Sequence, residues 1–263
     1  MKFILPFIFC FCFTYVNGQV LNIDREIEED TIFKRVGAAL SFDFSNDKQR
    51  RNLVDFSNTS EIDIFLKNKF LFIFLTHTEF TLNGLQMLEN NGFFQFRFRD
   101  NDFRKISPDF FLQYQWNGIL GMQHRALLGS NARFRWLEEK KSDLYTSIGV
   151  FYEYEKWNPF TESYAFQADS VGIIVRKLIR LNASAKFAFK IAKNIDLVGS
   201  TFIQFPTNEF FLNPRWFFDT NLNFKVNGHI GFIIHYDHNF DNYRPFPIDD
   251  FYYTISVGLN LKI

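Results

Sequence analysis

The sequence predicts an all-β fold, an antiparallel up-and-down transmembrane β-barrel of about twelve strands. The first observation is the segment 252–263, in which apolar and polar side chains alternate strictly. A period of two indicates a strand whose two faces have different surroundings. The second is an N-terminal segment with the features of a secretion signal, and the third is the same alternation along the chain. In an exported protein, lipid outside and water inside account for this pattern.

Residues 1–18 are expected to be a signal peptide that is removed. Lys2 supplies the positive charge, and residues 3–13 form an apolar run that is too short to span a bilayer. Residues 16–18 precede the expected cleavage ahead of Gln19. This segment predicts export to the cell envelope rather than a membrane helix.

The rest of the chain is expected to form one domain. Residues 19–35 are charged and unpatterned, which predicts a short periplasmic leader, and residues 36–263 would form the barrel. Cys10 and Cys12 both lie in the signal, so the mature chain would have no disulfide. The 29 basic and 29 acidic residues do not favour nucleic acid as a partner.

Alternation predicts each strand in turn. Two segments, 69–79 and 195–205, carry apolar and polar residues on both faces, but they are about as long as the other predicted strands. Both are therefore predicted as strands. Each strand is close to the ~10 residues that cross a bilayer at a tilt. The predicted strands cover residues 36–44, 61–66, 69–79, 94–99, 110–117, 125–136, 147–155, 181–190, 195–205, 215–226, 230–237 and 252–263.

The links between these strands alternate between short and long. Short links are expected at 67–68 and 193–194 and at Asn227-Gly228, a strong hairpin dipeptide. Longer links are expected at 81–91, 157–171 and 239–250, on the opposite, external side. Short periplasmic turns and longer external loops are typical of outer-membrane barrels.

Several segments are similar to a known family. They are DFFLQYQWN at 109–117, RALLG at 125–129 with RFR at 133–135, and the paired prolines of the link before the last strand. Together they resemble the YdiY-like salt-induced outer-membrane protein family, a domain of unknown function. The sequence departs from that family at Ser45-Asn46 and at Ile263, where such barrels usually end in an aromatic residue. The resemblance implies a barrel in a Gram-negative outer membrane and brings no agreed activity.

Charged and amide side chains share the polar faces of the central strands. Side chains on one face of adjacent strands lie within about 5 Å of each other. We expect the lumen to be lined by Arg97, Arg99, Gln113, Gln115, Asn117, Arg125, Arg133, Arg135, Glu153 and Glu155. Two interpretations stay open: paired charges that plug the lumen, or a porin-like channel whose charges select a small solute.

The opposite faces are apolar, and we expect them to contact outer-membrane lipid. The segment 258–263, from Gly258 to Ile263, is also expected to contact the barrel-assembly machinery. A soluble lipocalin-like barrel would instead have polar outer faces and an apolar lumen. The predicted lipid-facing residues are Phe94, Phe96, Phe98, Tyr253, Ile255, Val257, Leu259, Leu261 and Ile263.

Histidines offer a metal site as an alternative. His229, His235 and Asp237 share one face of a predicted strand, and imidazole and carboxylate are metal ligands. No spacing in the chain matches a zinc motif. We therefore expect no metal and no cofactor.

An outer-membrane lipid hydrolase is the alternative from another class of function. It would need a hydroxyl beside a histidine, such as His77 with Thr76 or Thr78 and with Glu79, or His235 with Ser256. No nucleophile stands in a recognisable motif, so we predict no catalytic residue. The expected role is structural or that of a small-solute channel, and the sequence leaves the oligomeric state open.

Overall fold

The computed structural model describes residues 36–48, 52–66, 69–100, 105–139, 142–158, 172–209, 212–227, 230–242 and 250–261. The expected signal peptide and leader, as well as Ile263, lie outside the described residues. Within the described ranges, no helix is long and apolar enough to cross a membrane.

Twelve strands form one antiparallel sheet in which each strand pairs with its neighbours in sequence. The predicted all-β, up-and-down architecture is confirmed, and the two segments with mixed faces are strands β3 and β9. A short 3-10 helix, η2 (Thr207–Glu209), lies between β9 and β10. The strands are β1 (Val36–Lys48), β2 (Asn52–Leu66), β3 (Phe70–Asn83), β4 (Gln86–Asp100), β5 (Ile106–Asn117), β6 (Met122–Glu139), β7 (Ser142–Trp157), β8 (Ile174–Ala192), β9 (Ile195–Pro206), β10 (Arg215–Lys225), β11 (Ile230–Asp241) and β12 (Phe251–Leu261).

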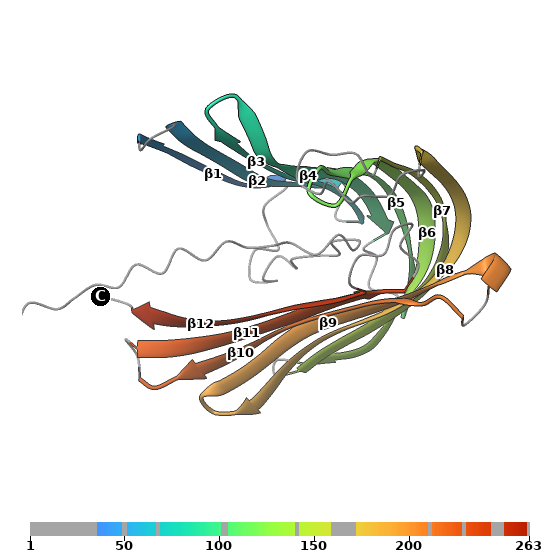
Figure 1. Ribbon diagram of the computed structural model, residues 1–263. Helices are drawn as coiled ribbons and strands as arrows, with labels where there is room; N and C mark the ends of the chain where they lie inside the picture. The colour runs from blue at the N-terminus through green and yellow to red at the C-terminus, as the bar shows by residue number, and fades with distance from the viewer. Residues whose placement is uncertain are drawn as a thin grey trace, which may run out of the picture.

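The sheet curls into an incomplete ring (Figure 1). Strands β5 to β8 form the bend, β1 to β4 form one arm, and β9 to β12 form the other. Each strand is rotated by about −20 to −25° relative to its neighbour, and this twist accumulates over many strands. Among the described residues no pairing joins β1 to β12, so these two strands border the opening.

Burial distinguishes the two faces of the sheet. In β5, Gln113 and Gln115 are buried, whereas Phe110 and Leu112 are 49% and 52% exposed. The buried polar face is the concave one, because its side chains meet across non-neighbouring strands, as Arg215 of β10 and Glu153 of β7 do. The apolar side chains therefore cover the convex face, opposite to the arrangement of a lipocalin-like barrel.

Aromatic rings stack across neighbouring strands on the convex face. Phe96 of β4 lies 4.9 Å from Phe74 and 6.2 Å from Phe72, both in β3, measured between ring centroids. Phe98 and Phe110 continue the row at 6.2 Å. Cross-strand aromatic pairs of this kind contribute about 0.2–1 kcal/mol each, so the phenylalanines help to fix the strand register.

The concave face also contains a small apolar cluster, which alternation alone did not predict. Phe111, Leu127, Phe151 and Phe202 are buried there, and Phe217 packs against them. The rings of Phe111 and Phe151 lie 6.1 Å apart, one on each side of β6. These side chains fill the inside of the bend formed by the central strands.

The expected long link at 81–91 is wrong. Strand β3 continues to Asn83 and β4 begins at Gln86, so that Gly84 and Leu85 form a tight turn. Gly84 has a φ of 67°, a conformation that glycine adopts without strain. The alternation did not reveal these strand ends, because Met87 and Leu88 are adjacent apolar residues and the register of the two strands shifts between Thr81 and Leu82. The expected short link at 193–194 is confirmed by the bounds of β8 and β9.

Gly129 in β6 provides the first test of the packing. A Cβ atom at this position would lie 2.5 Å from Cβ of Phe151 and 2.6 Å from Cζ of Phe111. We expect Gly129→Ala to lower the free energy of unfolding by about 1–3 kcal/mol, because overpacking strains a filled interior. Urea unfolding of the refolded protein in detergent measures this change. Gly258→Ala is the control, since no atom lies within 4 Å of its added methyl group, and equal effects of both variants would contradict the packing.

Candidate functional site

Two glutamates and three arginines form a buried ionic cluster on the concave face. Glu153 and Glu155, two residues apart in β7, are 0% and 1% exposed. Arg125 forms ion pairs with both, at 3.3 Å between its Nε and Oε1 of Glu155. Arg180 pairs with Glu153, and Arg215 contacts Glu153 at 3.0 Å and Glu155 at 3.4 Å. These five residues are called the arginine–glutamate cluster below.

The cluster joins side chains from four strands. Three of these strands are adjacent in the sheet, and the fourth is not adjacent to any of them. Arg125 comes from β6 and Arg180 from β8, the two strands that flank β7. Arg215 comes from β10, with β8 and β9 between it and β7. Its Nε also donates to Oδ2 of Asp241 in β11 at 3.0 Å. The guanidinium group of Arg215 therefore reaches across the inside of the curled sheet.

Charge balance explains why these side chains tolerate burial. Three guanidinium groups face the carboxyl groups of Glu153, Glu155 and Asp241. Buried ions are stable only when they are paired and hydrogen bonded, because removing each one from water costs several kcal/mol. The cluster is thus a set of mutually dependent contacts, and it occupies space on the concave face that solvent would otherwise fill.

A second polar group lies beside the cluster, on β4 and β5. Arg97 and Arg99 contact Asp109 at 3.3 and 3.9 Å. The amide of Gln95 donates to Gln113 at 2.6 Å, and Gln113 donates in turn to Gln115. This group continues the polar concave face toward the arm that contains β1 to β3.

The remaining predicted lumen residues, Arg133, Arg135 and Asn117, lie on the same face. Arg133 and Arg135 lie over the ring of Tyr145, at 4.0 and 5.4 Å from its centroid. Asn117 is buried at the end of β5, where its Oδ1 accepts a hydrogen bond from the backbone N–H of Leu120. Arg135 is half-buried, in contrast to the other predicted lumen residues, which are buried.

The sequence analysis missed Arg180, Arg215, Asp109 and Asp241. Arg180 shares the face of Asn182 in β8, one step before the predicted start of that strand. Extending the alternation by one residue would have included it. Arg215 was on a recognised polar face, but its contact with Glu153 depends on the curvature of the sheet and carries no local signal.

The predicted lipid-facing residues lie on the convex face wherever the structure describes their side chains. Phe94 is 51% exposed, and Tyr253, Ile255, Val257 and Leu259 are 58–63% exposed. Phe96 and Phe98 are half-buried beneath the neighbouring rings of β3 and β5. The backbone of Leu261 pairs with Ile230 at the end of β12.

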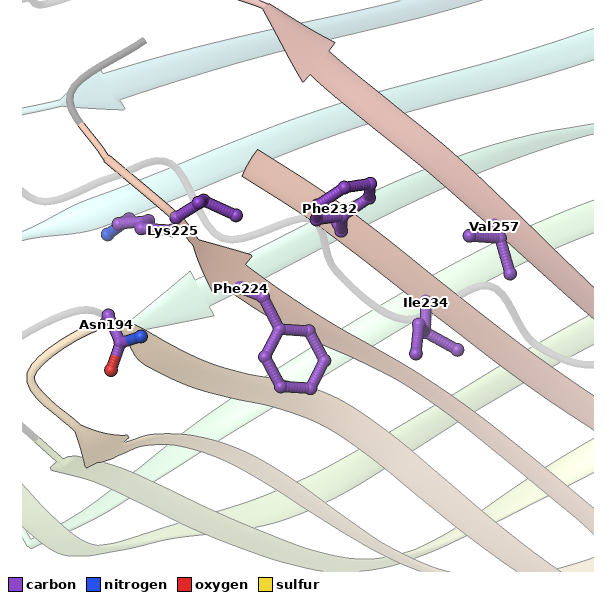
Figure 2. A pocket seen from close by; sticks show the side chains of 7 residues that line it. Asn194, Phe224, Lys225, Phe232, Ile234 and Val257 are labelled. Atoms are coloured by element: carbon purple, nitrogen blue, oxygen red, sulfur yellow. The ribbon is translucent and has the colours of Figure 1, made fainter. Parts of the chain in front are cut away.

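A groove on the convex face belongs to this apolar surface (Figure 2). It encloses about 560 Å³ at the turn end of β10 to β12. Ligand sites usually combine an apolar wall with several convergent polar groups, whereas this groove has two polar residues at its edge. It is lined by Asn194, Phe224, Lys225, Val226, Phe232, Ile234 and Val257.

His235 does not form a catalytic pair with Ser256. The two residues are register partners in β11 and β12. However, Nδ1 of His235 lies 3.1 Å from Oδ1 of Asn221, and Nε2 lies 3.1 Å from Oδ1 of Asp237. Both ring nitrogens are therefore engaged, which leaves neither of them to accept a proton from Ser256.

The second histidine combination is separated by the sheet. His77 faces the concave side, where Nδ1 lies 2.9 Å from Oγ1 of Thr59 and Nε2 lies 3.5 Å from Glu79. Thr76 and Thr78 alternate with His77 along β3 and face the convex side. Neither threonine can thus use His77 as a base.

No metal site is found in the part of the chain that the structure describes: no three His, Cys, Asp or Glu side chains there are placed to hold an ion. His229, one of the three residues considered for such a site, lies outside the described residues.

These features define a curled antiparallel meander with a charged concave face and an apolar convex face. Residues 88–260 match the model of the family described as "Protein of unknown function, DUF481", and the chain belongs to this family. No curated protein matches the chain. Among solved structures, the NanC porin in a rhombohedral crystal form is similar, with 11% sequence identity and a TM-score of 0.40. That similarity covers 87% of this chain and 98% of the porin chain.

Glu153 provides the test of the ionic cluster. We expect Glu153→Gln to lower the free energy of unfolding by about 3–5 kcal/mol, because it leaves buried arginines without their shared carboxylate. Denaturant unfolding in detergent measures the change. Lys225→Ala is the matched control: it breaks the exposed Lys225–Asp196 pair, which has a length of 2.6 Å, and should cost no more than about 1 kcal/mol. A similar small effect of both variants would show that the cluster does not stabilise the fold.

Proposed function

We propose that the protein is an outer-membrane β-barrel in which the arginine–glutamate cluster narrows the lumen. Its role is structural, or it allows only small polar solutes to pass. The observation that carries this proposal is the contact of Arg215 in β10 with Glu153 in β7. A side chain that bridges two non-neighbouring strands occupies the cross-section of the lumen at that level. The geometry therefore favours a filled or narrow passage over a wide pore.

The membrane location is supported by the distribution of side chains between the two faces. Large apolar residues on the convex face are exposed, and paired charges on the concave face are buried. Water would favour the reverse distribution, whereas lipid outside the barrel favours this one. The N-terminal segment and the likeness to YdiY-like salt-induced proteins extend the proposal to a Gram-negative outer membrane. Recognition of residues 258–263 by the assembly machinery is part of the same proposal.

The proposal requires that β1 pairs with β12 in the bilayer. A strand edge in contact with hydrocarbon has unsatisfied backbone N–H and C=O groups, so only a closed barrel spans a membrane. Both edge strands are long enough for this pairing, with 13 residues in β1 and 11 in β12. Closure would convert the concave face into a lumen.

Val257 tests which face contacts lipid. It lies near the middle of β12 and is 59% exposed on the convex face. We expect Val257→Arg to reduce the yield of heat-modifiable folded protein, because an arginine facing the bilayer midplane costs about 2–4 kcal/mol. Ser256→Arg, on the adjacent concave position, is the control and should fold. Equal folding of both variants in lipid vesicles would contradict the assignment of the faces.

Arg215 tests whether the cluster narrows the lumen. We expect Arg215→Ala to increase single-channel conductance in planar bilayers, because it removes the side chain that reaches across from β10. Glu153 keeps its pairs with Arg125 and Arg180 in this variant, so its carboxylate is not left alone.

Arg133→Ala is the control for this measurement. Arg133 lies on the same face, but over Tyr145 and outside the cluster. Its removal should change conductance less than the removal of Arg215. If neither variant raises conductance above that of the wild type, the cluster is not the narrowest part of the lumen.

A further inference from the structure

Two lysines lie on the convex face, at one end of the bend that β5 to β8 form (Figure 1). Lys156 shares its face of β7 with Tyr152, which is 45% exposed. Lys177 shares its face of β8 with Val175 and Ile179, which are 50% and 51% exposed. Lys156 itself is half-buried, and Lys177 is exposed. Both charges therefore lie on the surface assigned to lipid, where charged side chains are rare.

Neither lysine forms an ion pair with another described residue. Strand β8 contains no acidic residue, and Glu153 and Glu155 of β7 belong to the opposite, concave face. Lys156 pairs in register with Val175, so Lys177 occupies the diagonal position, with about 7–8 Å between the two Cα atoms. Like charges that are this close repel each other, and an anion bound between them would remove the repulsion.

A histidine and a tyrosine extend this group to β5 and β6. His124 pairs in register with Lys156 and is exposed on the same face. Its Nδ1 lies 2.6 Å from the hydroxyl oxygen of Tyr114, which is 40% exposed. When this hydroxyl donates to Nδ1, the neutral imidazole carries its proton on Nε2 and can donate a hydrogen bond of its own. Lys156, Lys177, His124 and Tyr114 are called the rim site below.

The rim site lies at the depth of lipid headgroups. Lys156 stands 14 residues after Ser142, where β7 begins, and one residue before the end of the strand. A rise of about 3.3 Å per residue and a tilt of about 40° place it roughly 35 Å from the opposite end of β7. The apolar band of such barrels is only about 25 Å tall, so the lysines lie beyond the hydrocarbon.

The lengths of the links indicate which side of the membrane this end faces. Residues 158–173 join β7 to β8 here, whereas residues 140–141 and 193–194 connect the other ends of these strands to β6 and β9. Short periplasmic turns and longer external loops are typical of outer-membrane barrels. In a Gram-negative outer membrane, the rim site would thus face the external leaflet, whose main lipid is a glycolipid with phosphate groups.

We propose that the rim site binds the phosphate group of a glycolipid in the external leaflet. This inference rests on the proposed function, which places the convex face in lipid. Lysine binds phosphate as a point charge, and the imidazole and phenol groups add hydrogen-bond donors. Nearer to mid-bilayer, Leu128 and Ile179 are 62% and 51% exposed on the same face and would contact the acyl chains.

Native mass spectrometry with added lipid A tests the proposal. The processed chain is refolded in detergent, and the fraction that carries bisphosphorylated lipid A is measured. We expect Lys156→Gln combined with Lys177→Gln to weaken this binding about tenfold or more, because each lysine near an anionic lipid headgroup contributes to the attraction. Lipid A from which both phosphates have been removed should bind the wild type equally weakly.

Two further double variants separate a specific site from net charge. Lys156→Arg with Lys177→Arg keeps both charges and should retain binding. Lys190→Gln with Lys193→Gln is the matched control, because it removes two exposed lysines at the opposite end of β8 and in the turn that follows. This control should bind bisphosphorylated lipid A as the wild type does. Heat-modifiable mobility shows that each variant folds.

Four outcomes would overturn the proposal. They are unchanged binding by the Lys156→Gln, Lys177→Gln variant, an equal loss in the control, equal binding of lipid A with and without phosphates, and equal affinity for phosphatidylglycerol. The comparison between lipids uses the wild type and so does not depend on the folding of any variant. Failure of the proposed function is distinguishable, because the protein would then not insert into lipid vesicles, whereas a barrel without this site would insert and bind no lipid A.

Discussion

The burial of Glu153 is the constraint on which the rest of the concave face depends. Its carboxylate has no access to solvent and is shared by arginines from β6, β8 and β10. The arginine from β10 reaches it only because the sheet is curved, and the curved sheet can enclose these charges only because each finds a partner. Charge pattern and curvature therefore stabilise each other. The apolar convex face is the complement of this arrangement, since every strand alternates between the two faces.

Much of this fold could be predicted because its signal is local. Alternation within one strand places Phe110 outward and Gln113 inward without knowledge of any other strand, and the structure agrees. The same rule failed at residues 81–91, where the register of β3 and β4 shifts after Thr81 and the adjacent apolar residues Met87 and Leu88 interrupt the alternation. It also gave no indication of the apolar cluster around Phe111 and Phe151, because residues on the polar face were expected to contact water. Whether a side chain on the concave face contacts water or packs against other side chains depends on the curvature of the sheet.

The sequence predicted which residues lie at the site better than it predicted which of them contact each other. Glu153 and Arg125 were both assigned to the inner face, and both are part of the ionic cluster. Arg215 was missed, because 62 residues separate it from Glu153 and no spacing rule relates β7 to β10. The engagement of both nitrogens of His235 was likewise invisible in the sequence. Contacts between non-neighbouring strands depend on the curvature of the sheet, and the alternation of residues along one strand does not reveal that curvature.

The outer edges of β1 and β12, which have no neighbouring strand among the described residues, bear on how such a chain matures. Ten of the eleven interstrand ladders of the described residues join β1 to β11 and can form before β12 is synthesised, whereas the ladder between β11 and β12 must wait for the last strand. Until then, the backbone N–H and C=O groups at both edges of the sheet are unpaired, and an extended segment of another protein can add to either edge. A sheet with two long unpaired outer strands is therefore exposed to pairing with other chains at both edges.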